Sequence, residues 1–219
     1  MNFSIVSRHE ERRSELEQFI HHLFKVQYGA DIDHYLPWLM SIDTIEGGLQ
    51  GALGINPAET TTLFLEQYLN HPIEAVIAEA TQQNIFRANI VEVGNLAANS
   101  AGGARLLIVA LTAFLRGAEY EWVTFTALPA LINSFHRLGI PLYTLADANP
   151  DQLEDRGKSW GSYYEGAPQV VAGNVRQGFK ALQQASAAER LHAALVWSEA
   201  YSSGCQLRVT QPDPCSMAL

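Results

Sequence analysis

Two adjacent glycines near the middle of the chain are the first residues that could bind a charged ligand. Gly102 and Gly103 follow the apolar segment 90–98, whose short length predicts a buried strand. The apolar segment 104–116 predicts a helix, so the loop 99–103 would place bare backbone N–H groups at the positive end of that helix dipole. Amides in this arrangement can hold a phosphate or pyrophosphate.

The glycine pair has an equally good structural explanation. A tight turn that leads into a helix capped by Ser100 needs the same residues. No Walker lysine follows the glycines, and the Gly-x-Gly-x-x-Gly spacing of a dinucleotide site is absent. The order of the elements around the loop favours the anion site.

Composition and charge limit the function classes. The chain has 219 residues, 47% of them hydrophobic, and can bury a substantial core as one large domain or two closely packed halves. Its net charge of -9 argues against a nucleic-acid binder, which needs a basic face. Cys205 and Cys215 form neither a metal spacing nor a disulfide framework, which indicates a reducing, cytoplasmic setting.

Membrane and export signals are also missing from the sequence. Residues 1–10 show no apolar core beside a cleavage site, so we expect no secretory signal. The longest apolar run, 106–115, is about half of the roughly 20 residues that a membrane span needs. We therefore expect a core helix there and no membrane span.

The hydrophobic pattern predicts a chain of strands and helices. Strands are expected at 3–6, 38–43, 49–55, 90–98, 122–127 and 160–164, with one more that ends at 146. Helices are expected at 10–28, from 56, at 73–83, 104–116 and 176–197, with an amphipathic helix before 140 and a short one from 149. From Ser202 onward the sequence predicts a loose tail.

This order of elements resembles the acyl-CoA-binding core of the GNAT N-acyltransferase superfamily. Four motifs resemble the thermostable hemolysin family of bacterial proteins: FLEQYL at 64–69, EVGNLA at 92–97, WVTFTA at 122–127 and WGSYY at 160–164. The order is also similar to that of acyl-homoserine-lactone synthases. The resemblance implies an α/β (α+β) fold with a mixed, mostly antiparallel central sheet flanked by helices. It implies a GNAT-like acyltransferase domain over 1–180, then a C-terminal helix and flexible tail over 181–219.

The same resemblance implies a binding site for an acyl donor, either a coenzyme A thioester or the phosphopantetheine of acyl carrier protein, and no metal. A donor phosphate would lie on the amides of Gly102, Gly103 and Ala104. The thioester arm would lie beside the strand end, where separation from the strand 122–127 leaves room. The predicted donor residues are Leu96, Ala97, Ala98, Ser100, Gly102, Gly103, Ala104 and Arg105, the last being almost as well explained as a surface arginine.

Acyl transfer to an amine needs a base near the thioester carbonyl, and Glu92 is the candidate. It is expected on one strand face with Gly94 and Leu96, where burial would raise its pKa toward neutrality. An ion pair with Arg87 is the structural alternative. Asn95 is expected on the other face, where it orients substrate or bonds backbone. Tyr164 is a candidate phenol for reprotonating the leaving thiolate.

The usual superfamily position of a tyrosine acid is occupied by Phe135, which cannot donate a proton. The predicted acceptor-binding residues are Glu66, Tyr68, Thr126, Ser162 and Tyr163. For Glu66, and for Glu74 beyond the break at His71-Pro72, the favoured interpretation is that they are solvated helix acids, and the alternative is that they line a cleft. Tyrosines in a late strand are also common in cores.

Three function classes remain open from the sequence. The favoured one is an N-acyltransferase that acts on an amine-bearing small molecule. A membrane-active hemolysin and a non-catalytic acyl-donor-binding module are the alternatives. The arginine expected near Ile55-Asn56 in acyl-homoserine-lactone synthases is absent, which leaves the donor undecided; for a carrier-protein partner the available basic residues are Arg87, Arg105, Arg116 and Arg137. The oligomeric state is not predicted.

Overall fold

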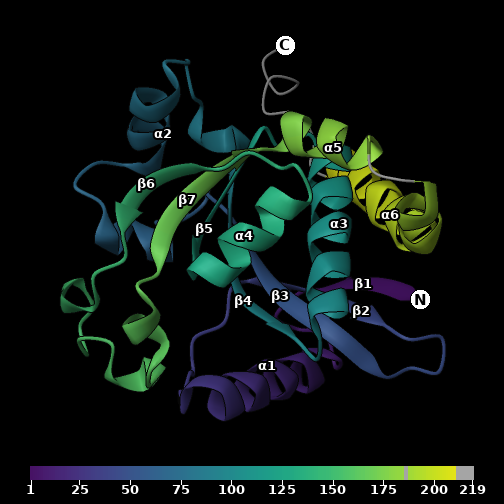
Figure 1. Ribbon diagram of the computed structural model, residues 1–219, viewed down its shortest axis with the longest axis horizontal. Helices are drawn as coiled ribbons and strands as arrows, with labels where there is room; N and C mark the ends of the chain where they lie inside the picture. Colours follow the sequence, from purple (N-terminus) through teal and green to yellow (C-terminus); the bar gives the residue numbers. More distant parts are fainter. Residues whose placement is uncertain (185–186, 211–219) are drawn as a thin grey trace.

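The computed structural model describes residues 1–184 and 187–210 of the chain. Its centre is a seven-stranded sheet in the order β1-β2-β3-β4-β5-β7-β6 (Figure 1). The strands are β1 (Asn2–Val6), β2 (Trp38–Asp43), β3 (Leu49–Pro57), β4 (Ile90–Ala98), β5 (Trp122–Ala127), β6 (Tyr143–Asp147) and β7 (Gln169–Asn174). Only the β4–β5 pair is parallel, so the sheet is mixed and mostly antiparallel, as expected.

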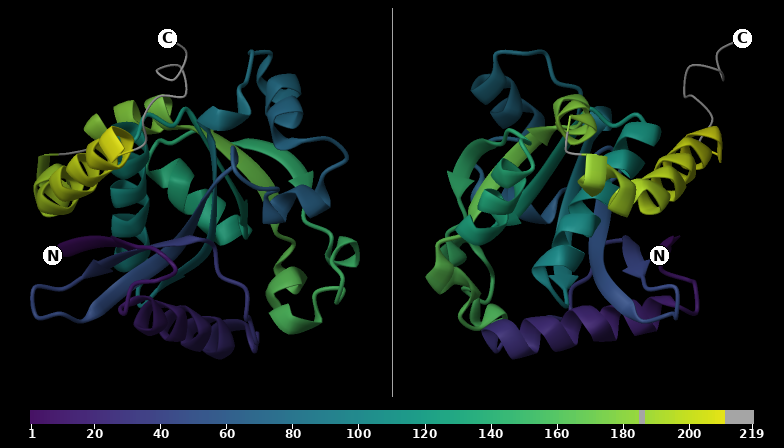
Figure 2. Two further views of the ribbon diagram at one scale, coloured as in Figure 1. Left: turned by 180° about the vertical axis from the view of Figure 1, so that it is seen from behind. Right: turned by 45° about the vertical axis from the view of Figure 1, so that its right-hand side comes forward.

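Helices cover both faces of the sheet (Figures 1 and 2). The helices are α1 (Arg13–Tyr28), α2 (Ile73–Thr81), α3 (Ala101–Gly117), α4 (Pro129–Arg137), α5 (Val175–Gln183) and α6 (Ala187–Thr210). Short 3-10 turns lie at η1 (Phe64–Tyr68), η2 (Arg87–Asn89), η3 (Pro150–Gln152), η4 (Lys158–Trp160) and η5 (Tyr163–Gly166). Successive strand residues face opposite layers: Leu39 packs in the cluster of α1, and Met40 packs in the cluster of α3.

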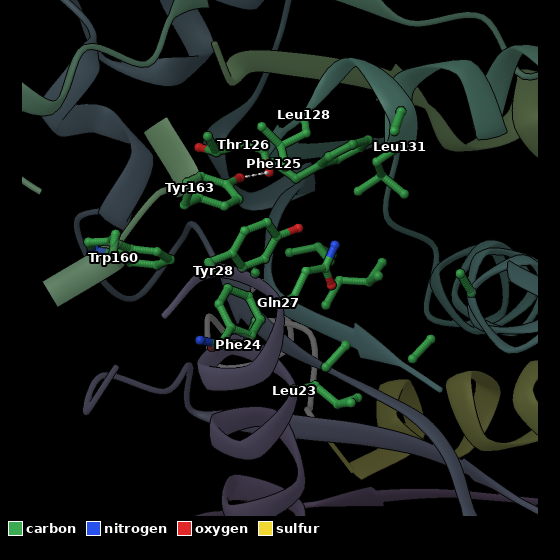
Figure 3. Close-up of a pocket in the computed structure, with 18 of the residues that line it drawn as sticks. Leu23, Phe24, Gln27, Tyr28, Phe125, Thr126, Leu128, Leu131, Trp160 and Tyr163 are labelled. Atoms are coloured by element: carbon green, nitrogen blue, oxygen red, sulfur yellow. Dashed lines mark hydrogen bonds between the residues drawn. The ribbon is translucent and has the colours of Figure 1, made fainter. Parts of the chain in front are cut away.

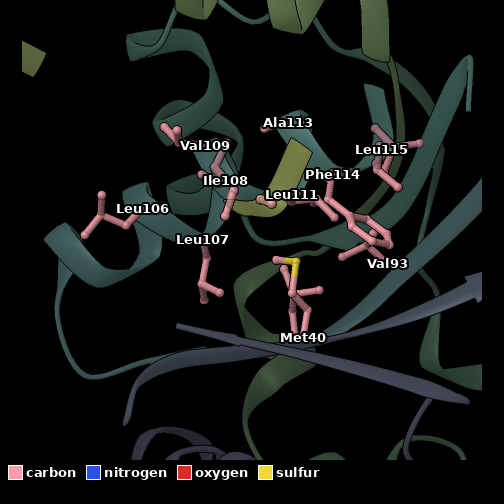
Figure 4. Close-up of a cluster of buried hydrophobic side chains, with 14 of the residues drawn as sticks. Met40, Val93, Leu106, Leu107, Ile108, Val109, Leu111, Ala113, Phe114 and Leu115 are labelled. Carbon is pink, nitrogen blue, oxygen red and sulfur yellow. The ribbon is translucent and has the colours of Figure 1, made fainter. Parts of the chain in front are cut away.

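Helix α3 is buried along most of its length. Every residue from Leu106 to Leu115 is buried, because the sheet covers one side of the helix and α6 another. Figure 4 shows Leu107 and Phe114 of α3 reaching the side chains of Met40 and Val93 on the sheet. The run that is too short to cross a membrane is therefore a core helix, as expected.

The sheet opens between β4 and β5. Their pairing extends only from Ile90 beside Trp122 to Val93 beside Phe125, although β4 continues to Ala98. The register of β3 and β4 shifts in the same region, and Asn95 has a left-handed φ of 53°. Such a bulge bends a strand and ends its pairing with a neighbour.

The structure corrects several element boundaries. Helix α3 begins at Ala101 and not at Ala104, so both glycines lie in its first turn. The expected helix start at residues 56–59 is wrong, because Asn56 and Pro57 end β3 and a turn follows. Beyond Ser202, where we expected a tail, α6 continues to Thr210. The expected tail at 211–219 lies outside the described residues.

The segment 160–164 is not a strand, as we expected, but parts of the turns η4 and η5. Gly161 between them has a φ of +54°, and a Cβ there would lie 2.0 Å from the backbone oxygen of Tyr28. The glycine therefore allows this loop to pack directly against the end of α1. The extra strand of the sheet is β7, which lies between β5 and β6.

The close crossing of α3 and α6 gives a stability prediction. A Cβ on Gly117 would lie 2.3 Å from the oxygen of Tyr201, and one on Gly204 would lie 2.2 Å from the oxygen of Phe114. We expect Gly117→Ala and Gly204→Ala each to destabilise the protein by about 1–3 kcal/mol, because rigid backbone must move. Thermal unfolding should show a melting temperature lowered by roughly 3–10 °C.

The control is Gly48→Ala, since the nearest atom to its Cβ would be the Thr44 hydroxyl at 3.4 Å, an ordinary contact. Equal melting temperatures for all three variants would contradict this account of the crossing.

Candidate active site

A pocket of about 440 Å³ lies where β4 and β5 separate. Its walls come from the ends of these strands, the C-terminal turns of α1, the first turn of α3, α4 and the loop around Trp160 (Figure 3). Sites of this size are typical of small-molecule binding, and most of the lining is apolar. The structure therefore brings the residues around the predicted donor strand to one hollow.

Glu92 is the buried charged group at this pocket. The residue is 3% exposed, and one carboxylate oxygen accepts the backbone N–H of Leu65 at 2.9 Å. The other oxygen accepts the backbone N–H of Phe64 at 3.0 Å and the side-chain amide of Asn56 at 3.4 Å. Burial raises the pKa of the Glu92 carboxyl above its usual range, and these hydrogen bonds oppose the rise.

The bulge at Asn95 changes which residues share a face with Glu92. Leu96 packs against the cluster around α3, whereas Ala97 packs with the cluster of α1. The two valines on either side of Glu92 lie in the same cluster as Leu96, so Glu92 faces the other way. The expectation that Leu96 shares the face of Glu92 is therefore wrong, because one extra residue in the strand reverses the alternation.

The alternative ion pair between Arg87 and Glu92 is not formed. Arg87 instead binds both oxygens of Glu66, at 2.7 and 2.8 Å, and Glu74 at 2.8 Å. Burial acts to raise the pKa of Glu66, but hydrogen bonds from Arg87 and from backbone N–H groups lower it to about 2. Glu66 and Glu74 are therefore paired acids and not solvated ones.

Glu66 has a positioning role in this geometry. Its oxygens also accept the backbone N–H groups of Leu63 and Ile73, and its side chain is not among those that line the pocket. These contacts hold η1, whose first two amides bind Glu92. The direct acceptor contact that we expected for Glu66 has no support in these contacts.

Asn95 lines the pocket, but its side chain serves the backbone. Its oxygen accepts the N–H of Leu36 at 3.1 Å, and its amide nitrogen donates to the oxygen of His34 at 3.1 Å. These two bonds attach the linker after α1 to β4. Of the two readings from the sequence, backbone bonding is the one that the structure shows.

The predicted donor residues separate into two groups. Leu96, Ala97, Ala98, Ser100 and Ala104 line the pocket, whereas Gly102, Gly103 and Arg105 do not. The hydroxyl of Ser100 accepts the N–H of Gly103 at 3.1 Å, and the Ser100 carbonyl accepts the N–H of Ala104 at 3.0 Å.

The three-amide cradle is therefore corrected, because two of its amides already bond within the fold. Gly103 is needed for a close approach, since a Cβ would lie 2.8 Å from the oxygen of Gln50. Helix geometry leaves the N–H groups of Ala101 and Gly102 without an intrahelical acceptor. These two amides are the ones that a donor phosphate could use.

Two tyrosine hydroxyls meet near the opposite wall, and a third tyrosine bonds the backbone of β5. The Tyr68 and Tyr164 hydroxyls are 2.5 Å apart, and Tyr163 donates to the oxygen of Thr126 at 3.4 Å. Burial raises the pKa of Tyr68 to about 12, and burial with the bond to Tyr68 raises the pKa of Tyr164. Both phenols are therefore protonated at neutral pH, and the raised pKa makes each a weaker acid than a free tyrosine.

Thr126 lines the pocket as well, whereas Ser162 does not and donates its hydroxyl to the oxygen of Tyr28 at 3.2 Å. Phe135 forms part of the wall, where it stacks on Phe125 at a centroid distance of 4.9 Å. The position that lacks a tyrosine acid is thus an apolar part of the pocket.

Helix α1 contributes side chains to the pocket that no sequence pattern indicated. Phe24, Gln27 and Tyr28 line the pocket from this helix, and His34 and Phe64 line it from the segments that follow. Phe24 and Tyr28 are four residues apart and share a helix face, a pattern that indicated a packed helix and gave no sign of a ligand.

The comparisons with known proteins agree with this architecture. The family model for thermostable hemolysins matches residues 6–179. The chain belongs to the thermostable hemolysin family. No curated protein sequence matches it.

Solved structures of three synthases are similar to this family member. The AHL synthase LasI matches with a TM-score of 0.57 and 12% identity, over 83% of this chain and 93% of LasI. BjaI, a CoA-dependent acyl-homoserine lactone synthase solved with SAM and isopentyl-CoA, matches with a TM-score of 0.54 and 14% identity, over 88% of this chain and 98% of BjaI. FeeM, an N-acyl amino acid synthase from uncultured soil microbes, matches with a TM-score of 0.52 and 14% identity, over 80% of this chain and 93% of FeeM. The expected fold, a mixed and mostly antiparallel sheet flanked by helices, is therefore confirmed.

The described residues contain neither a membrane-spanning helix nor a cluster of metal ligands. Within residues 1–184 and 187–210 no helix is both long and apolar enough to cross a membrane. The same part of the chain contains no group of three or more histidine, cysteine or acidic residues placed to hold a metal ion.

The Arg87–Glu66 pair gives a second prediction. We expect Glu66→Gln to lower the free energy of unfolding at pH 7 by about 1–3 kcal/mol, since Arg87 loses a charged partner. Folding lowers the pKa of Glu66 from 4.5 to about 2. The contribution of Glu66 to the free energy of unfolding is therefore complete above pH 4.5 and is lost as the pH falls toward 2. Urea unfolding between pH 7 and pH 3 should therefore show a smaller acid-induced loss in the variant.

Glu79→Gln, at an exposed position of α2, is the matched control and should follow the parent protein at every pH. An unchanged stability of Glu66→Gln at pH 7 would show that the pair does not stabilise η1.

Proposed function

We propose that this thermostable hemolysin family member is an N-acyltransferase. It moves an acyl group from a coenzyme A thioester, or from the phosphopantetheine of acyl carrier protein, to the amine of a small molecule. The observation that carries the proposal is a buried carboxylate, Glu92, at a largely apolar pocket beside the separated strands β4 and β5. The enzyme fold of its structural neighbours supports it.

The donor arm fits the open edge of β4. Beyond Val93 this strand has no pairing partner on the β5 side, and residues 94–98 line the pocket. A phosphopantetheine arm carries amide groups, which can bond to exposed strand backbone as an added strand does. The amides of Ala101 and Gly102 at the start of α3 would hold the phosphate.

The reaction needs two proton transfers. Glu92 accepts a proton from the amine, the amine nitrogen attacks the thioester carbonyl, and the carbon–sulfur bond breaks. The products are an amide and a thiol, so the leaving sulfur must gain a proton. Tyr164 is the proposed donor; it regains a proton from water through Tyr68, whose hydroxyl lies 2.5 Å away, and Glu92 releases to water the proton that it took from the amine.

Glu92 is suited to the role of base by its surroundings. Burial raises its pKa, which makes the carboxylate a stronger base than an exposed one. The two backbone amides of η1 keep the carboxylate in one orientation. A base held in this way needs no reorganisation before the reaction.

The proposal includes two acyl donors, coenzyme A and a carrier protein, and a binding experiment distinguishes them. Arg87 is engaged by Glu66 and Glu74, so it is a poor dock for an acidic carrier protein. Location in the cytoplasm remains a prediction from the sequence.

The central prediction concerns Glu92→Gln. We expect turnover to fall by about 10²- to 10⁴-fold with the fold retained, because glutamine cannot accept the proton. For the parent protein, kcat/KM should decline as pH falls through a pKa above 4.5, the ordinary value for glutamate. Release of free thiol from acyl-CoA in the presence of amines measures both effects.

The control variant Glu79→Gln, which replaces an exposed glutamate, should keep full activity. Full activity of Glu92→Gln would remove Glu92 as the base. Leakage of liposomes by the purified protein without any acyl donor or amine would instead favour the membrane-active alternative.

A fourth prediction concerns donor binding. Acyl-CoA at about 100 times its Kd should stabilise the protein by roughly 2.7 kcal/mol, seen as a raised melting temperature. Acylated carrier protein is the parallel arm of the same experiment. Binding of a donor without turnover on any amine would favour the non-catalytic binding module, and the absence of any shift would contradict donor binding altogether.

A further inference from the structure

The acceptor half of the pocket has an aromatic wall built around Trp160. The indole lies 5.5 Å from the ring of Tyr163, 5.9 Å from that of Phe64 and 6.1 Å from that of Phe24, measured between centroids. Figure 3 shows Phe24 and Tyr28 of α1 and Trp160 and Tyr163 of the opposite loop around one hollow. Aromatic rings in this arrangement bind a flat apolar body or the face-on positive charge of an amine.

Backbone contacts hold the two sides of this wall together. The N–H of Ser162 donates to the oxygen of Tyr28 at 2.8 Å, and the N–H of Asp31 donates to the oxygen of Ser159 at 2.7 Å. Gly161 lets the loop approach α1 without a side chain between them. Backbone hydrogen bonds and close packing therefore fix the aromatic wall, which joins α1 to the loop 148–168.

The charged side chain that lines the pocket is negative, and no cationic lysine or arginine in the described part of the chain lines it. The negative group is the carboxylate of Glu92. The imidazole of His34 stacks on Phe64 with ring centroids 5.7 Å apart and belongs to an exposed residue at the rim of the pocket. An acceptor that carried its own carboxylate would bring a second negative charge close to Glu92 without a cation to pair it.

The segments around the aromatic wall are also acidic. The loop 148–168 contains four acidic and two basic residues, and the linker 29–37 contains two aspartates and no lysine or arginine. The whole chain has a net charge of -9. This field attracts a cationic amine and repels an anionic or zwitterionic end that exposes its carboxylate.

We infer that the acceptor is a primary amine with an aromatic or other apolar body and no carboxylate, of the arylalkylamine class, and that an amino acid is rejected. The inference rests on the proposed acyl transfer and adds the substrate class of the same site. The ring of the acceptor lies against Trp160 and its neighbours, and the amine faces Glu92. The same carboxylate that receives the amine's proton therefore also selects against a second carboxylate.

The test uses pairs of amines that differ only in a carboxylate. Tryptamine is compared with tryptophan, and tyramine with tyrosine, using the full chain and a medium-chain acyl-CoA, with release of free thiol as the readout. We expect kcat/KM for the amine of each pair to exceed that for the amino acid by on the order of 100-fold. Thermal shifts by the same four compounds, with coenzyme A present, report acceptor binding without turnover.

A substitution that supplies the missing cation sharpens the test. Gln27 lines the pocket from an exposed position on α1, so Gln27→Arg can place a guanidinium at the rim. We expect the preference for tryptamine over tryptophan to fall by about 10-fold. Val26→Arg, on the neighbouring position that is 71% exposed and does not line the pocket, adds the same charge and should leave the preference unchanged.

The outcomes separate this inference from the proposed function. Turnover of tryptophan and tyrosine at rates equal to the amines would overturn the carboxylate-free class and leave the acyltransferase standing. Binding of the amines but not of the amino acids would support the inference. If the bound amines were not acylated, that lack of turnover would contradict the catalytic proposal. If none of the four compounds is bound or acylated, the assignment of the aromatic wall to the acceptor is wrong.

Discussion

The separation of β4 from β5 is the constraint on which the rest of the site depends. Four residue pairs hold the strands in parallel, and the ladder then stops although both strands continue. The cause lies in β4, where Asn95 takes a left-handed φ that asparagine tolerates better than most residues. Its side chain holds the linker after α1 in place. One bulge therefore opens the sheet and orders the neighbouring wall.

A second set of contacts stabilises the buried carboxylate of Glu92. Arg87 binds Glu66, Glu66 holds the backbone on both sides of η1, and η1 presents two amides to Glu92. A buried carboxylate without such partners would be protonated or would not be tolerated. The ion pair outside the pocket and the carboxylate inside it thus act as one structure, joined by a short turn.

The aromatic wall consists of residues from distant parts of the chain that line one pocket. Phe24 and Trp160 are separated by most of the sequence, yet their rings are 6.1 Å apart. Helix α1 alone would be an ordinary amphipathic helix, and the loop 148–168 alone would have no folded surface to pack on. Their joint packing supplies an apolar hollow beside a single negative charge, which is the property that our proposal of an amine acceptor uses.

The sequence by itself determined the elements with a strong local pattern: β1, β2, β4, β5, α1 and the buried α3. Hydrophobic periodicity and capping residues fix such elements because the interactions are local. The mixed sheet and the family came from the resemblance of its motifs to known proteins. The sequence also singled out Glu92, Tyr164 and the strand end 96–98, which the fold places at one pocket. Only the tertiary structure decided that Arg87 pairs with Glu66, that Ser100 occupies the Gly103 amide, and that residues 160–164 form turns against α1. These features depend on contacts between residues far apart in the chain, which no local pattern encodes.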